Sequence, residues 1–311
     1  MLDLSHIPNA TKARVWQCGG CTVAAGAGWM PWQRQRGETM AYMLLLGSGG
    51  GGGTGVVGAN STAAGGGGGG SAGQSRILIP LALLPDQLFV SVPYDAQGAG
   101  VASYISIAPN ITTNHLLLHA AGGGVGGNAA GATAGAAGAA GAISTIATAP
   151  LGGLGDPVYL AGQAGIIGGT TVAGAALTLP VTGLICTGGT GGGGLPAAAA
   201  TGTNGGSFTV PAAPSPFPAH IGGVGSATAT NPADPGRGGY DNVIRGLMYQ
   251  YGGTGGASTH GTATGGGLVQ ARGGDGIGWG CGGGGMGGAL TASTAAVASK
   301  GGPGVAIIIS W

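Results

Sequence analysis

The two most closely spaced cysteines, Cys18 and Cys21, form a CxxC pair in the segment WQCGGCT. Such a pair can act as a redox couple or supply half of a zinc site. A zinc site needs about four ligands, and no second CxxC or HxxxH partner lies nearby. Cys186 and Cys281 are isolated, and no thioredoxin-like βαβ pattern surrounds the pair. We therefore favour a structural pair, two free thiols or a tight turn, and we expect no metal.

Two histidines, His115 and His119, flank the apolar run Leu116–Leu118. On a helix, this i, i+4 spacing would place both rings on one face, as in some zinc sites. The run is short, however, and no acidic residue lies between the histidines. On a strand the two side chains would lie about 13 Å apart, from the rise per residue. The spacing therefore predicts no metal site here.

Other catalytic motifs lack their required settings. GxGxxG spacings arise by chance in a chain with 78 glycines among 311 residues, and no convincing amphipathic helix accompanies them. Lys300 lies in SKGGPG without a P-loop pattern, and no GxSxG lies in a strand–turn–helix context. The eight carboxylates are scattered and give no obvious glycosidase pair. We expect neither enzymatic activity nor a cofactor.

The segment with the most varied chemistry is Asn231–Tyr251, NPADPGRGGYDNVIRGLMYQY. Tyrosine combines a large contact area with a hydrogen-bonding tip and few rotatable bonds, so it suits recognition loops. Varied side chains amid a monotonous sequence are typical of a binding loop on a rigid scaffold; a packed insertion or a subunit contact is an equally good interpretation. The candidate receptor-contact residues are Arg237, Tyr240, Asp241, Arg245, Tyr249 and Tyr251. Asp95–Gly100 and Pro211–His220 are further candidate contact loops.

Residues 1–40 differ from the rest of the chain, because they hold three of the five tryptophans and half of the cysteines. We predict that this segment attaches or caps the body, with Trp16, Trp29 and Trp32 as attachment candidates. Residues 41–311 would then form a glycine-rich body, with a variable insertion near 207–251.

Composition narrows the class of protein further. Charged residues make up only 5% of the chain, the mean hydropathy is +0.36 and the net charge is +1. Disordered chains are usually polar and charged, so this composition favours a packed structure, and no basic surface indicates nucleic acid. Residues 96–155 and 157–233 carry no charge, so we expect burial against copies of the chain or within a larger assembly. We expect neither a signal peptide nor a membrane-spanning helix.

The elements that must position these residues are short strands. Tyr42–Leu46 and Val305–Ile309 are apolar runs next to glycine, and the second is β-branched. Such runs favour buried strands over helices, and we predict that the first strand (about 41–46) and the last (about 305–310) pair or lie adjacent. Further strands are expected within Arg76–Val92, around a turn at Leu84–Asp86, and at Tyr104–Ala108, Leu116–Leu118, Ile143–Ala147 and Val158–Leu160.

Glycine recurs at every third residue in two stretches, GAAGAAG from Gly135 and GQAGIIG from Gly162. Three residues per turn is the polyproline II repeat, and such helices hydrogen-bond only with their neighbours. We therefore predict packed polyglycine II-like segments; irregular loops over a β core are the alternative. In Gly276–Gly282, glycine alternates with large residues, and on a strand this spacing would give one glycine face and one face of large side chains. The expected fold class is mainly β with polyglycine II-like or irregular packing and few or no α-helices.

Several segments together resemble a known class of viral protein. They are Trp29–Gly53 (WMPWQRQRGETMAYMLLLGSGGGGG), the repeated glycine tracts, IPLALLPDQLFVSV and the terminal GGPGVAIIISW. In layout and composition the chain resembles glycine-rich structural proteins of tailed-bacteriophage virions. It is also similar to the glycine-rich tail-fibre adhesins of T-even-like phages, which pack polyglycine II helices and display variable recognition loops. The resemblance spans most of the chain and transfers no receptor-contact residue.

The resemblance implies a non-enzymatic protein on the external surface of a virion, in a tail fibre or tail tip, that binds the host surface. The expected partners are copies of the chain (a trimer, by analogy with fibres), other virion proteins and a host cell-surface receptor. Nucleic acid and membrane insertion are not expected. A capsid decoration or head-fibre protein without a receptor role and a non-viral glycine-rich wall or matrix protein are the alternatives.

Overall fold

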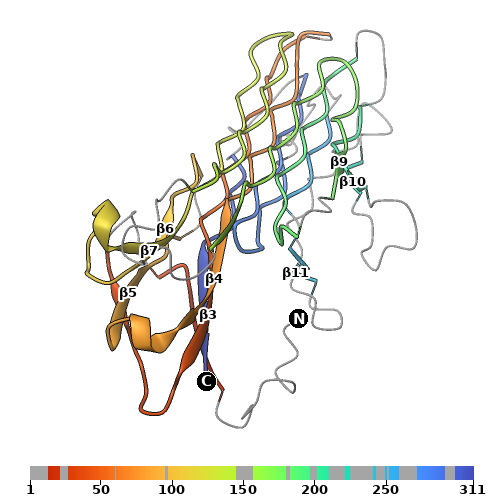
Figure 1. Ribbon diagram of the computed structural model, residues 1–311. Coiled ribbons are helices and arrows are strands. Elements are labelled where there is room, and N and C mark those ends of the chain that lie inside the picture. Colours follow the sequence, from red (N-terminus) through yellow and green to blue (C-terminus); the bar gives the residue numbers. More distant parts are fainter. Residues whose placement is uncertain are drawn as a thin grey trace.

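The computed structural model describes residues 13–21, 27–59, 61–94, 97–144, 157–179, 183–196, 202–209, 221–224, 241–242, 249–250, 252–258, 272–290 and 298–311. In this part of the chain the structure is mainly β, with two short 3₁₀ helices. Figure 1 shows two regions, a set of paired strands and a bundle of extended glycine-rich segments that rises from them. The expected fold class is confirmed.

The larger sheet has five antiparallel strands in the order β1–β13–β3–β4–β8. Their bounds are β1 (Arg14–Gly19), β13 (Val305–Ser310), β3 (Met40–Leu46), β4 (Gln74–Pro80) and β8 (Val158–Leu160). The predicted pairing of the first and last apolar runs is confirmed, because Leu46 lies opposite Val305 and Ala41 opposite Ser310. β13 also pairs with β1, so the last strand lies between two strands from the beginning of the chain.

The second sheet packs against the first as the other half of a β-sandwich. Its antiparallel strands are, in order, β2 (Met30–Gln33), β5 (Gln87–Ser91), β6 (Ser103–Ser106) and β7 (Leu116–Ala120). Side chains from both sheets form one buried cluster that includes Met43, Leu45, Ile308, Leu88 and Ile105. Alternate residues of β3, β4, β5 and β13 belong to this cluster, as expected where one face of a strand packs on a core.

The strand predictions are largely confirmed, with one difference in topology. Arg76–Val92 does form two strands around a turn, but they are not a hairpin: the 3₁₀ helix η3 (Leu81–Leu83) carries the chain from β4 in one sheet to β5 in the other. β6, β7 and β8 lie at the predicted positions, and the 3₁₀ helix η4 (Thr113–His115) precedes β7. Of the strand predicted over 143–147, Ile143 and Ser144 are not in a strand and the rest lies outside the described residues.

Four two-residue strands complete the described structure. β9 (Leu177–Thr178) pairs in parallel with β10 (Phe208–Thr209), and β11 (Asp241–Asn242) pairs antiparallel with β12 (Tyr249–Gln250).

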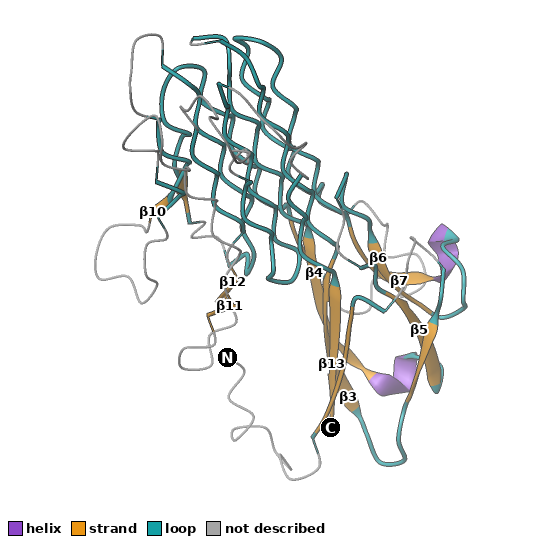
Figure 2. Ribbon diagram, turned by 180° about the vertical axis from the view of Figure 1, so that it is seen from behind, coloured by secondary structure: helices purple, strands orange, loops and turns teal. Residues whose placement is uncertain are grey.

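Extended glycine-rich segments continue directly from the strands of the larger sheet. β3 leads into Gly47, whereas Gly73 and Gly304 lead into β4 and β13. Figure 2 shows these strands passing into the interwoven pattern of extended segments. We call this pattern the polyglycine lattice; its segments are residues 47–56, 62–73, 97–101, 121–144, 161–175, 184–195, 202–207, 221–224, 252–258, 272–290 and 298–304.

Residues 64–73 are the most enclosed segment of the polyglycine lattice. Three successive N–H groups donate to three different neighbours, and the pattern then repeats. The donor–acceptor pairs are Gly65–Gly169, Gly66–Met286, Gly67–Gly127, Gly68–Ile166, Gly69–Gly283 and Gly70–Gly124. Its carbonyl groups accept from three further stretches, 50–53, 135–138 and 189–192, through the N–H groups of Gly50, Gly53, Gly135, Gly138, Gly189 and Gly192. A repeat of three with bonds only between segments is the pattern of packed polyglycine II-like helices.

Only glycine fits at residues 65–70 of this central segment, because the backbone of the neighbouring segments is in direct contact with them. A Cβ atom added to Gly67 would lie 1.9 Å from the carbonyl oxygen of Ala136, and one added to Gly70 would lie 1.9 Å from that of Ala139. Non-bonded carbon atoms pack best at about 3.5–4.0 Å. A single methyl group would therefore force the neighbouring segments apart.

Outer segments keep glycine only where they face inward. Gly135, Gly138 and Gly141 donate to carbonyl groups of the central segment, whereas Ala136 and Ala137 are exposed. The second predicted stretch packs on the first in the same way, through the N–H groups of Gly162, Gly165 and Gly168. The predicted polyglycine II-like segments are therefore confirmed, and the glycine content of each segment reflects how many of its sides are packed.

Buried hydroxyl groups replace backbone hydrogen-bonding groups inside the polyglycine lattice. Thr190 Oγ1 accepts from the Gly255 N–H and donates to the Gly206 carbonyl. Ser299 Oγ accepts from the Gly52 N–H. Thr190 and Ser299 are both fully buried, so these side chains complete the lattice where glycine is absent.

The alternating segment Gly276–Gly282 does not form a strand. Residues 278–280 form a bend and a turn, and Gly280 has a φ of +70°. Its N–H donates to the Pro303 carbonyl, and its own carbonyl accepts from Ala72. Glycine at alternate positions suits a left-handed turn as well as a strand.

β1 (Arg14–Gly19) and β2 (Met30–Gln33) are strands of the two sheets of the sandwich, so these parts of residues 1–40 are integral to it. The division at residue 40 into an attachment or capping segment and a glycine-rich body stays a prediction.

Replacement of Gly67 by alanine is expected to destabilise the fold by more than about 3 kcal/mol, or to prevent folding, because the methyl group overlaps the Ala136 carbonyl. Gly98→Ala is the matched control, because a Cβ there meets nothing within 4 Å, and we expect it to change stability by less than about 1 kcal/mol. Denaturant unfolding followed by circular dichroism measures both variants. Equal stabilities would contradict the packing of the central segment.

Candidate functional site

The predicted receptor-contact residues fall on a segment of which the structure describes only β11 and β12. Asp241 lies opposite Gln250, and Asn242 lies opposite Tyr249. Asp241 and Tyr249 are thus brought to adjacent strands of one ladder. The other four candidates lie outside the described residues; they are Arg237, Tyr240, Arg245 and Tyr251.

The described residues on either side of this segment belong to the polyglycine lattice. Gly223 donates its N–H to the Gly255 carbonyl, and Gly252 donates to the Thr187 hydroxyl. The segment therefore leaves and rejoins the polyglycine lattice at two neighbouring, hydrogen-bonded segments. In Figure 1, β11 lies beside the bundle, toward its sheet end.

Of the other candidate loops, part of Asp95–Gly100 is described. Gln97, Gly98 and Ala99 are exposed, while the Gly98 carbonyl accepts from Gly51 and Gly100 donates to Gly123. This loop is therefore an exposed border of the polyglycine lattice. Pro211–His220 lies outside the described residues.

Turns at the end of the polyglycine lattice farthest from the sheets form an exposed surface that the sequence did not single out. The chain turns around 57–59 and 61–62, at 129–133 and at 169–172, at the top of Figure 1. Hydrogen bonds hold these turns together, because Ala64 donates to Gly131 and Gly65 donates to Gly169. Val57 and Val172 are exposed there. The available signal was the interruption of glycine tracts by threonine and valine, as in GTTV from Gly169.

The three tryptophans predicted to mediate attachment pack on the β-sandwich. Trp32 is 1% exposed and lies in the buried cluster, with the Arg14 guanidinium 5.5 Å from its ring centroid. It therefore offers no contact surface in the folded chain. Trp16 is partly buried against the same cluster, and the Trp29 ring lies 6.4 Å from the ring of Tyr104. All three contribute to packing of the sandwich.

A buried ion pair that the sequence did not reveal joins both ends of the chain. Glu38 is 6% exposed, and its Oε1 lies 3.2 Å from Arg14 Nε and accepts a hydrogen bond from Ser310 Oγ. Glu38 Oε2 accepts from the Gln35 N–H, and Arg14 donates to the Gln33 carbonyl. This network links β1, β13 and the connection from β2 to β3.

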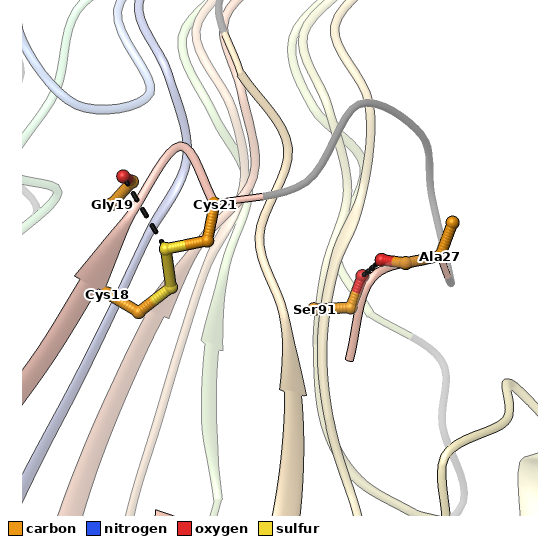
Figure 3. The surroundings of a disulfide bond; sticks show 5 residues. All are labelled: Cys18, Gly19, Cys21, Ala27 and Ser91. Atoms are coloured by element: carbon orange, nitrogen blue, oxygen red, sulfur yellow. Dashed lines mark hydrogen bonds between the residues drawn. A yellow bond between two sulfur atoms is a disulfide. The ribbon is translucent and has the colours of Figure 1, made fainter. Parts of the chain in front are cut away.

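Cys18 and Cys21 form a disulfide bond, so the structure supports the interpretation of the CxxC motif as a structural pair. Figure 3 shows the bond at the end of β1. Cys21 donates its N–H to the Val92 carbonyl, and the Ser91 hydroxyl donates to the Ala27 carbonyl. The disulfide and these bonds hold the chain that leaves β1 against the end of β5.

Cys186 and Cys281 are present as buried thiols. Burial raises the pKa of the Cys186 thiol to about 12, and a hydrogen bond with Ser71 opposes this shift only in part. The thiolate is the reactive form of cysteine, so Cys186 is chemically inert in the folded chain.

The two histidines make local contacts on different elements. His115 Nδ1 lies 2.9 Å from Asn110 Oδ1, whereas His119 stacks on Tyr104 and its Nδ1 lies 3.2 Å from Ser144 Oγ. Burial lowers the pKa of His119. Within the described residues, no group of three or more His, Cys, Asp or Glu side chains could hold a metal ion.

No helix in the described part of the chain is long and apolar enough to cross a membrane.

Comparison with known proteins assigns no family, since no family model and no curated protein matches the chain.

Thiol counting tests the cysteine assignments. We expect Ellman's reagent to find no reactive thiol in the folded chain at pH 8, because both thiols are buried and the pKa of Cys186 is about 12. Unfolding without reductant should release the two thiols of Cys186 and Cys281, and unfolding after reduction should release all four. Four thiols without reductant, or a fast reaction in the folded state, would contradict the assignments.

Glu38→Gln is expected to lower the free energy of unfolding by about 1–3 kcal/mol, because the change leaves Arg14 without its charged partner in a mostly buried site. Asp86→Asn is the matched control: the Asp86 side chain is 90% exposed and lies 3.7 Å from Arg34, and exposed pairs contribute little. Urea unfolding measures both variants. A loss in Asp86→Asn as large as that in Glu38→Gln would refute the role of the buried network.

Proposed function

We propose that this chain is a structural protein of a bacteriophage virion, placed in a tail fibre or tail tip, where it binds the host surface. The observation that carries the proposal is the polyglycine lattice itself. Its segments are joined by backbone hydrogen bonds in several directions, so it is suited to hold exposed turns and insertions in fixed positions. The resemblance of the sequence to glycine-rich phage adhesins provides the particular class.

Two surfaces suit the contact with a host. One is the segment that includes β11 and β12, which holds the six predicted receptor-contact residues and is bounded on both sides by the polyglycine lattice. The other is the set of turns at the far end, with exposed Val57 and Val172. Function in recognition proteins commonly resides in loops that a rigid scaffold positions.

The β-sandwich at the other end is suited to attachment to the remainder of the appendage. It lies opposite the far-end turns, and there the Trp311 carbonyl accepts from the N–H groups of Thr39 and Met40. In this proposal the partners are other virion proteins and a host cell-surface receptor, and the chain lies on the external surface of the particle.

The test is cryo-electron microscopy of the native assembly, with particles labelled by a Fab raised against the purified chain. Labels on a tail fibre or tail tip support the proposal. Labels on capsomers would overturn it in favour of capsid decoration, and a cellular wall or matrix as the source of the chain would favour the non-viral alternative.

Recognition itself is tested by competition. Purified chain added before infection should reduce adsorption of the phage to its host, and Asp241→Ala/Tyr249→Ala chain should compete less well because both positions lie on the β11–β12 ladder. Val172→Thr changes the other candidate surface, the far-end turns, so its competition is compared with that of the β11–β12 variant. If the unaltered chain fails to compete at saturating concentration, the receptor-binding part of the proposal is wrong.

A further inference from the structure

The open edges of the two large sheets are protected in different ways, and β1 is the exception among the described strands. β2 carries Pro31, which cannot donate to another strand. At β7 the Ser75 hydroxyl donates to the His119 carbonyl, and β8 is only three residues long. β1 has six residues, pairs in regular register with β13 alone, and contains no proline, lysine or bulge. Long unprotected edges are sites where another strand can add.

The register identifies which groups of β1 face outward. Gly20 donates its N–H to the Gly304 carbonyl, and hydrogen-bonded pairs alternate along an antiparallel ladder. The even-numbered residues of β1 therefore bond to β13, and the N–H and C=O groups of Val15 and Gln17 point away from the sheet. Within the described residues, no group pairs with them.

The side chains at this edge are compatible with association. Val15 is 52% exposed, although it lies in a cross-strand row with Ile309 and Tyr42. The one charged residue of β1 is Arg14, and its charge is paired with Glu38 inside the chain. The outer face of the edge thus carries one exposed apolar side chain, Val15, and one exposed uncharged polar side chain, Gln17, and β1 presents no unpaired charge to a neighbour.

We propose that β1 pairs antiparallel with β1 of a second copy of this chain, about a two-fold axis at Trp16. In this register, Val15 of each copy lies opposite Gln17 of the other, so their N–H and C=O groups form four hydrogen bonds. Trp16 lies opposite its symmetry mate, and two five-stranded sheets become one continuous sheet. The inference is independent of the host-binding proposal.

A second copy fits this edge better than an unrelated strand because the edge is self-complementary. Two-fold interfaces place the same residues on both sides, and here each copy offers the same two donors and two acceptors at positions symmetric about Trp16. The net charge of +1 produces little repulsion between copies.

The test is sedimentation velocity of the full chain over a wide concentration range, with two substitutions at one position. Gln17→Pro removes an outward N–H while keeping every bond to β13, and we expect it to raise the dimer dissociation constant by about 10–100-fold. Gln17→Thr keeps the N–H and is expected to retain the dimer. Circular dichroism checks that both variants fold.

Amide exchange of the unaltered chain provides a second readout if Gln17→Pro fails to fold. The Val15 and Gln17 amides should be protected at concentrations where the dimer forms and exchange quickly on dilution. A chain that stays monomeric at every concentration, or a dimer that Gln17→Pro does not weaken, would overturn the proposal. Protection of these two amides only in the presence of another virion protein would overturn it too.

Discussion

The structure depends on one constraint: backbone N–H and C=O groups that leave water must be paired, and an extended glycine segment can pair only with other segments. Residues 65–70 meet this constraint by donating to three neighbours and accepting from three more. The neighbours then lie so close that a Cβ atom would overlap their carbonyl oxygens. Ordering glycine costs roughly 0.5–1 kcal/mol more than ordering alanine, and complete pairing of the backbone is what offsets this cost.

The β-sandwich and the polyglycine lattice are mutually dependent. β3, β4 and β13 pair over their full lengths and continue as segments of the polyglycine lattice, so the sheet sets the spacing and direction of the first segments. Hydroxyl groups such as that of Thr190 then complete the pairing where glycine is absent. A lattice held in this way can keep the far-end turns and the β11–β12 segment in fixed positions, which is the property that the proposed host-binding role requires.

Sequence patterns predicted the parts of the fold that are local. The apolar runs at β3 and β13 and the glycine period from Gly135 identified their elements correctly, because side-chain type and spacing determine both. An all-glycine tract carries no side-chain pattern that specifies its neighbours, so the six contacts of the central segment could not be predicted. Nor could the bond between Glu38 and Ser310, which are 272 residues apart. Composition identified the segment around β11 and β12 as a candidate. It did not reveal that this segment begins and ends at two neighbouring segments of the polyglycine lattice.

The most direct test of the polyglycine lattice is residue-resolved amide hydrogen exchange by NMR. The account predicts slow exchange at every residue from Gly65 to Gly70, since each N–H is paired. Along 135–141 it predicts a period of three: slow exchange at Gly135, Gly138 and Gly141, and fast exchange at Ala136, Ala137, Ala139 and Ala140, whose N–H groups have no partner in the described structure. Continuous protection along 135–141, or fast exchange throughout Gly65–Gly70, would contradict it.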